Sequence, residues 1–78
     1  MNTQLDEGIQ ALYSGNLEKA DELLTKAIEQ DPSNAEAYFH RGKARWQSGA
    51  LPAAINDFQK TLDINPLHNQ AKVSMEMV

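Results

Sequence analysis

The fold of this chain follows from a stretch of sequence that occurs twice. Residues 8–32 read GIQALYSGNLEKADELLTKAIEQDP, and residues 42–66 read GKARWQSGALPAAINDFQKTLDINP. A shift of 34 residues aligns residues 1–34 with residues 35–68 and gives seven identical pairs, where ordinary residue usage gives roughly two by chance. The pairs are Gly8/Gly42, Ser14/Ser48, Gly15/Gly49, Leu17/Leu51, Ala20/Ala54, Lys26/Lys60 and Pro32/Pro66. The chain therefore contains two copies of one structural unit.

Each copy contains two segments with the apolar spacing of an α-helix. Leu51, Ile55 and Phe58 are an example, because residues three or four apart lie on one face of a helix. Glycine and proline turn signals separate the segments, at Gly15, Asp31-Pro32, Gly49 and Asn65-Pro66. We predict helices near residues 3–14, 18–30, 35–48 and 52–64. Ser33 followed by Glu36 further predicts a capping box at the start of the third helix.

The tail from Asn69 to Val78 has a mixed pattern. Ala71, Val73 and Met75 alternate with polar residues, as in a strand. No other strand is predicted with which this tail could pair, so we expect a short fifth helix.

Length and composition limit the possible functions. The chain has 78 residues, of which 41% are apolar, no cysteine and a formal net charge of −4. This length corresponds to one domain and excludes a multidomain enzyme, while the lack of cysteine excludes disulfides and thiolate metal sites. The negative charge argues against nucleic acid or an anionic membrane as a partner. The chain shows neither a signal peptide nor an apolar run near the ~20 residues that span a bilayer, so we expect a soluble, cytoplasmic protein.

The chain resembles the tetratricopeptide repeat in three features. These are the length of the repeat period, the small residues where helices meet and the proline that closes each unit. The residues that carry the resemblance are Gly8, Gly15, Ala20, Leu24, Ala27 and Pro32 in the first unit, and Tyr38, Gly42, Gly49, Ala54, Phe58 and Pro66 in the second. The resemblance implies an all-α solenoid, in which two antiparallel helix hairpins form a right-handed superhelical stack. It divides the chain into a first repeat over 1–34, a second repeat over 35–68, and a capping helix or truncated third repeat over 69–78.

No group of residues suggests catalysis, a cofactor or a metal. The two histidines, His40 and His68, have no serine, aspartate or second histidine three or four residues away, and we expect both at the surface. The acidic residues of the second helix, including Asp21 and Glu22, are interpreted as a solvated face. We therefore predict a non-enzymatic protein with no cofactor and no bound metal.

The resemblance also implies a concave wall, built from the first helix of each unit, on which a partner binds. The partner-binding residues expected there are Leu5, Ile9, Leu12, Phe39, Lys43, Trp46 and Gln47, and the same wall includes Asn2, Gln70 and Val73. Exposed apolar patches and tryptophan are typical of interaction sites. We predict that this wall holds a peptide or helix segment of a partner protein by apolar burial with a polar rim. Whether Phe39 and Trp46 line the groove or pack in the core stays open at this point.

One partner class known from the family is not expected. Some members grip the C-terminal carboxylate of heat-shock chaperones with Lys, Arg and Asn side chains. The matching positions here are Leu5, Ile9, His40, Gln70 and Ser74. These positions lack the required cations, so we predict no such carboxylate clamp.

The alternative function is homo-oligomerisation through the apolar wall and the C-terminal helix. Residues 1–34 carry a formal charge of −5, whereas the second half contains the cluster Arg41, Lys43 and Arg45. Opposite charges of this kind favour a head-to-tail contact between copies.

Overall fold

The computed structural model describes residues 3–77, which form five α-helices. In chain order these are α1 (Thr3–Tyr13), α2 (Leu17–Gln30), α3 (Ala35–Gln47), α4 (Leu51–Ile64) and α5 (Asn69–Met77). The first four agree with the predicted ranges to within one residue, and the tail is helical rather than extended. Asn2, which the sequence assigned to the concave wall, lies outside the described residues.

The two repeated glycines end α1 and α3 in the same way. Gly15 and Gly49 have φ angles of 85° and 91°, a left-handed conformation that glycine adopts without steric cost. The residue after each glycine closes the turn with a backbone hydrogen bond. The amide of Asn16 donates to the carbonyl oxygen of Ala11 at 2.9 Å, and the amide of Ala50 donates to the carbonyl oxygen of Arg45 at 2.8 Å. The recurrence of glycine at this spacing is therefore a requirement of the backbone.

The predicted capping box at the start of α3 is wrong. Asn34 caps this helix, because its side-chain oxygen accepts a hydrogen bond from the amide of Ala37 at 3.3 Å. The hydroxyl of Ser33 donates instead to Asp31 at 3.0 Å. The carboxylate of Glu36 lies 2.9 Å from Nε2 of His68, in the loop between α4 and α5.

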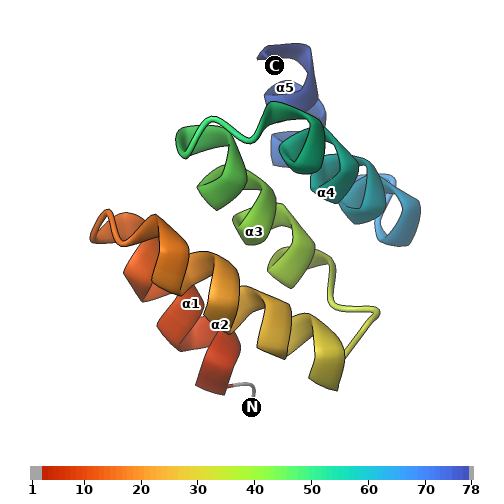
Figure 1. The fold of residues 1–78 in the computed structure, drawn as a ribbon. Coiled ribbons are helices and arrows are strands. Elements are labelled where there is room, and N and C mark those ends of the chain that lie inside the picture. Colours follow the sequence, from red (N-terminus) through yellow and green to blue (C-terminus); the bar gives the residue numbers. More distant parts are fainter. Residues whose placement is uncertain (1–2, 78) are drawn as a thin grey trace.

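The helices form two antiparallel hairpins, α1–α2 and α3–α4, and α5 follows as the first helix of a third unit would (Figure 1). The hairpins are joined through the contact of α2 with α3, and α1 also reaches α3, while α5 packs against α4. This arrangement is the predicted all-α solenoid. The helices enclose two clusters of buried apolar residues, one centred on Leu24 and the other on Phe58, both fully buried.

Two further glycines allow the helices of each hairpin to approach closely. A Cβ atom added at Gly8 would lie 2.7 Å from the Cγ of Leu24, and one added at Gly42 would lie 2.8 Å from Cε1 of Phe58. These distances are shorter than van der Waals contact. Leu24 and Phe58 occupy the same position in the two copies of the unit, so each repeat brings its largest fully buried side chain against its own glycine.

Candidate functional site

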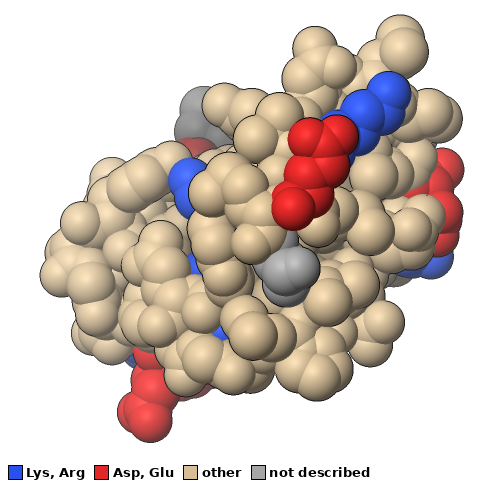
Figure 2. All heavy atoms as spheres, turned by 90° about the horizontal axis from the view of Figure 1, so that it is seen from above, with Lys and Arg blue, Asp and Glu red and all other residues tan. Residues whose placement is uncertain are grey.

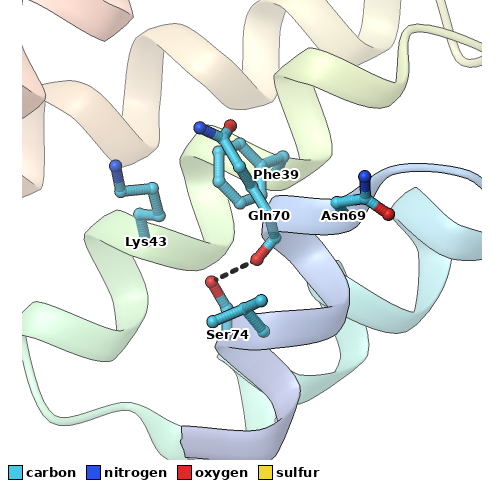
Figure 3. A pocket seen from close by; sticks show the side chains of 6 residues that line it. Phe39, Lys43, Asn69, Gln70 and Ser74 are labelled. Atoms are coloured by element: carbon cyan, nitrogen blue, oxygen red, sulfur yellow. Dashed lines mark hydrogen bonds between the residues drawn. The ribbon is translucent and has the colours of Figure 1, made fainter.

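A hollow of the surface lies between α3 and α5. It has a volume of about 320 Å³. Its lining residues are Phe39 and Lys43 from α3, and Asn69, Gln70, Val73 and Ser74 from α5. Figure 3 shows the side chains of the two helices that line this space, with Gln70 overlapping the ring of Phe39 in this view. We call this hollow the α3–α5 groove.

Phe39 forms the floor of the groove and belongs to the core as well. Its side chain is only 3% exposed and packs in the cluster with Phe58 and Ala71. Its ring centroid lies 4.6 Å from that of His68 and 5.1 Å from that of His40. Trp46 is half-buried against the same cluster. The question left open by the sequence is thus answered for Phe39: it packs in the core with one edge in the groove.

The residues expected on α1 lie apart from this groove. Leu12 is buried in the first core cluster, and Leu5 and Ile9 are half-buried against that cluster. Gln47 is exposed at the end of α3 and does not line the groove. Of the seven residues expected to bind a partner, the structure therefore brings Phe39 and Lys43 together at the groove.

The remaining lining residues come from the tail. Gln70 and Val73 had been placed on the concave wall by the resemblance, and both line the groove. Asn69 was missed, and Ser74 had been named only as a position of the family's carboxylate clamp. Ser74 follows Gln70 by four residues and so lies on the same helical face, a spacing from which its place on the wall could have been predicted.

Lys43 stands at one side of the groove over two aromatic rings. Its Nζ atom lies 5.5 Å from the ring centroid of Phe39 and 5.2 Å from that of Tyr13, the last residue of α1. The same ammonium group is 3.4 Å from the hydroxyl oxygen of Tyr13. Cation–π contacts of this kind hold the amine in place without neutralising its charge.

The two arginines of α3 point to the other side of the helix. Arg41 binds the buried carboxylate of Asp57 through two hydrogen bonds of 2.8 and 2.9 Å. Arg45 bridges Asp57 at 3.2 Å and Asp21 at 3.1 Å. Burial acts to lower the pKa of Arg41, but the hydrogen bonds and charge of Asp57 outweigh it and raise the pKa above the usual value. Asp21 is thus half-buried in an ion-pair network, which corrects its expected place on a solvated face.

Both histidines are buried, contrary to the prediction that they lie at the surface. His40 is 9% exposed and His68 is 8% exposed. The ring of His40 donates from Nδ1 to the carbonyl oxygen of Glu36 at 2.8 Å. His68 contacts the carboxylate of Glu36 through Nε2 at 2.9 Å, and its Nδ1 accepts the amide of Ala71 at 3.2 Å. His68 therefore joins α3 to the start of α5 and fixes one end of the groove.

The environment of His40 predicts a dependence of stability on pH. Burial lowers the pKa of His40 below its ordinary value of about 6.5, against the opposing effect of Glu36. The unfolded chain therefore takes up a proton at a higher pH than the folded chain. The stabilisation is complete above about pH 6.5 and is lost as the pH falls through the lower pKa of the folded state. We expect the free energy of urea unfolding to decrease between about pH 7.5 and about pH 5.5, a window above most carboxylate titration.

The variant His40→Gln tests this assignment, because an amide donates a hydrogen bond but does not titrate in this range. Its unfolding free energy should vary less over the same pH window. An equal pH dependence in the variant and the unaltered chain would show that another group is responsible.

Residues 3–77 contain no cluster of three or more His, Cys, Asp or Glu side chains able to hold a metal ion. None of the helices in this region is both long and apolar enough to cross a membrane. On the face seen in Figure 2, uncharged side chains predominate and charged side chains occur in small separate groups. The α3–α5 groove is the candidate site for recognition of another molecule.

Stacked helix hairpins with a groove between successive first helices define a helical-repeat module. The tetratricopeptide repeat profile matches residues 5–69. The chain therefore belongs to the tetratricopeptide repeat family, whose repeats mediate protein–protein interactions and are not catalytic.

Comparison with curated proteins finds relatives that are much longer than this chain. It is 34% identical over 61 residues to the Protein SGT1 homolog of Oryza sativa subsp. japonica, covering 78% of this chain and 17% of that protein. It is 31% identical over 67 residues to the FK506-binding protein-like protein of Mus musculus, covering 86% and 19%. It is 28% identical over 67 residues to the DnaJ homolog subfamily C member 7 homolog of Schizosaccharomyces pombe, covering 86% and 14%. The chain thus spans less than a fifth of each relative. No solved structure gives a significant match.

Proposed function

We propose that this chain binds a short extended or helical segment of a partner protein in the α3–α5 groove. The observation that carries the proposal is the hollow of about 320 Å³ between the two helices. Grooves that combine apolar surface with a few polar groups are typical of ligand and peptide sites.

Apolar side chains and hydrogen-bonding side chains both line the groove. Val73 is 53% exposed and lies with Phe39 among the lining residues. The exposed side chains of Asn69 and Gln70 each carry an amide, which offers two donors and one acceptor to a bound main chain. The hydroxyl of Ser74 donates to the main-chain oxygen of Gln70 at 2.8 Å (Figure 3). A partner side chain buried here would be surrounded by a polar rim, which is the usual anatomy of an interface.

The positions of the family's carboxylate clamp support a different mode from capture of a chaperone tail. Leu5 is half-buried beside the first core cluster. His40, at another of these positions, is buried and donates to the carbonyl oxygen of Glu36. Neither position offers a lysine, arginine or asparagine side chain to a terminal carboxylate, so these residues favour an internal partner segment over a chain end.

Self-association through the end of the stack is the second candidate. Leu67 is 79% exposed and Met77 is 62% exposed, and both lie at or near α5, where a further repeat would stack. Burial of such side chains against a second copy would remove apolar area from water. Sedimentation at increasing protein concentration separates this candidate from the first, because a chain that only binds peptides stays monomeric.

A selection experiment tests the proposed peptide binding. A phage-displayed library of random hexapeptides is selected on the immobilised chain, and enriched peptides are synthesised and titrated into the 15N-labelled protein. We expect the largest amide shifts at groove residues. The variant Val73→Gln should weaken binding at least about fivefold, since it removes an apolar contact from the groove.

The matched control is Leu67→Gln, which makes a similar change at an exposed residue that does not line the groove. Circular dichroism establishes that both variants keep their helicity. Equal binding of Val73→Gln and the unaltered chain, or amide shifts centred away from α3 and α5, would refute the proposal.

A further inference from the structure

The three cations of α3 differ in whether their charge is neutralised. Arg41 and Arg45 are held by Asp57 and Asp21 in the ion-pair network between the hairpins. Their guanidinium groups are therefore compensated and only partly accessible. Lys43 remains as the cation of α3 that faces the groove.

Lys43 has no carboxylate partner in the described part of the chain. The ion pairs of residues 3–77 involve Lys26, His40, Arg41, Arg45 and His68, but not Lys43. The contacts of its ammonium group are with the rings of Phe39 and Tyr13 and with the hydroxyl of Tyr13. These contacts orient the amine and leave its positive charge unbalanced.

Lys43 gives the groove a positive charge, because it is the charged residue among the six that line the groove. The other five lining residues are uncharged, although the chain carries a net charge of −4. Figure 3 shows Lys43 beside the ring of Phe39, on the side of the groove opposite Asn69. A carboxylate bound there would meet a cation next to a buried aromatic floor, where less water screens their attraction than in open solvent.

We infer that the groove selects a partner segment in which an internal aspartate or glutamate adjoins an apolar residue. The inference rests on the proposed function and specifies its ligand. The apolar side chain would lie on Phe39 and Val73, and the carboxylate would accept a hydrogen bond from the Nζ atom of Lys43. Lys43 supplies one positive charge, which balances one side-chain carboxylate. A C-terminal aspartate or glutamate carries a second, terminal carboxylate, which Lys43 would leave uncompensated.

The experiment repeats the hexapeptide selection on three proteins: the unaltered chain, Lys43→Gln and the control Lys19→Gln. Lys19 is exposed on α2, so its replacement changes the net charge equally without touching the groove. We expect aspartate or glutamate beside an apolar residue to be enriched on the unaltered chain and on Lys19→Gln, and this enrichment to disappear on Lys43→Gln.

Titration of a selected acidic peptide and its asparagine or glutamine counterpart then measures the effect. The acidic peptide should bind the unaltered chain about fivefold more tightly than its amide counterpart, the ratio expected of a partly exposed ion pair. The ratio should fall to about one on Lys43→Gln. Amidation of the peptide's C-terminus should leave binding unchanged, because the carboxylate concerned is internal.

The outcomes separate this inference from the proposed function. Apolar peptides that bind the groove without acidic enrichment would overturn the inference and leave the proposed function standing. Acidic enrichment that persists on Lys43→Gln, or that requires a free C-terminus, would also overturn it. If no peptide is enriched on any of the three proteins, the peptide-binding function fails and the inference fails with it.

Discussion

Replacing Asp57 by alanine is expected to unfold most of the protein. The carboxylate of Asp57 is 5% exposed and compensates both Arg41 and Arg45, which approach it from α3 at 2.8 to 3.2 Å. Removing one partner of a buried ion pair leaves an uncompensated buried charge, at a cost of about 3–5 kcal/mol. A domain of this size is rarely more stable than roughly 3–5 kcal/mol. Circular dichroism at 25 °C should show a large loss of helicity.

Two variants show whether the charge imbalance is the cause. Asp63→Ala removes an exposed carboxylate from the same helix, and its effect should remain below about 0.5 kcal/mol. The double variant Arg41→Leu with Asp57→Leu removes both partners, and it should be more stable than Asp57→Ala because apolar residues often replace a buried pair with little loss. An Asp57→Ala protein as stable as the unaltered chain would mean that the network contributes nothing to the fold.

Truncation of Phe58 to alanine should have an effect of similar size for a different reason. Its side chain is fully buried and meets Phe39 of α3 and Ala71 of α5 in the second core cluster. A Phe→Ala change in a core removes apolar contacts and leaves a cavity, which costs about 3–5 kcal/mol. We expect a large decrease in urea midpoint and the loss of α5 docking, visible as earlier hydrogen exchange of its amides.

The comparison is with Ile55→Ala on the same helix. Ile55 is 38% exposed, so its truncation creates no closed cavity and should cost less than about 1.5 kcal/mol. If the two variants unfold at the same urea concentration, Phe58 is not the centre of the second core.

The fold could be predicted from the sequence because its determinants are local and repeated. Gly15 and Gly49 each end a helix in a conformation that depends only on neighbouring residues. The apolar spacing of each segment fixes which side of the helix is buried, whatever it packs against. Because the pattern repeats after 34 residues, the helix prediction for the first hairpin also applies to the second. The family resemblance placed Gln70 and Val73 on the concave wall, and both residues line the groove.

Part of what the sequence analysis missed concerns polar residues whose partners are distant along the chain. Asp57 occupies the position in the second repeat that Leu23 occupies in the first, and both residues are buried. A carboxylate there is compatible with folding only because two arginines reach it from α3. His68 likewise meets the carboxylate of Glu36, 32 residues earlier in the chain, and the amide of Ala71 at the start of α5. Spacing within one helix contains no information about these contacts. His40 differs, because its partner Glu36 lies four residues earlier in the same helix, a contact that helical spacing allows.

The amino-acid sequence by itself determined the five helices, their pairing into repeats and the family, because helix propensity, turn chemistry and apolar period act over a few residues. Only the tertiary structure decided which cations are neutralised and which one faces the groove. Arg41, Lys43 and Arg45 are nearly equivalent as a sequence pattern, and they differ because a charge is balanced by whatever lies within a few ångströms of it in space. That distance is set by how the hairpins stack.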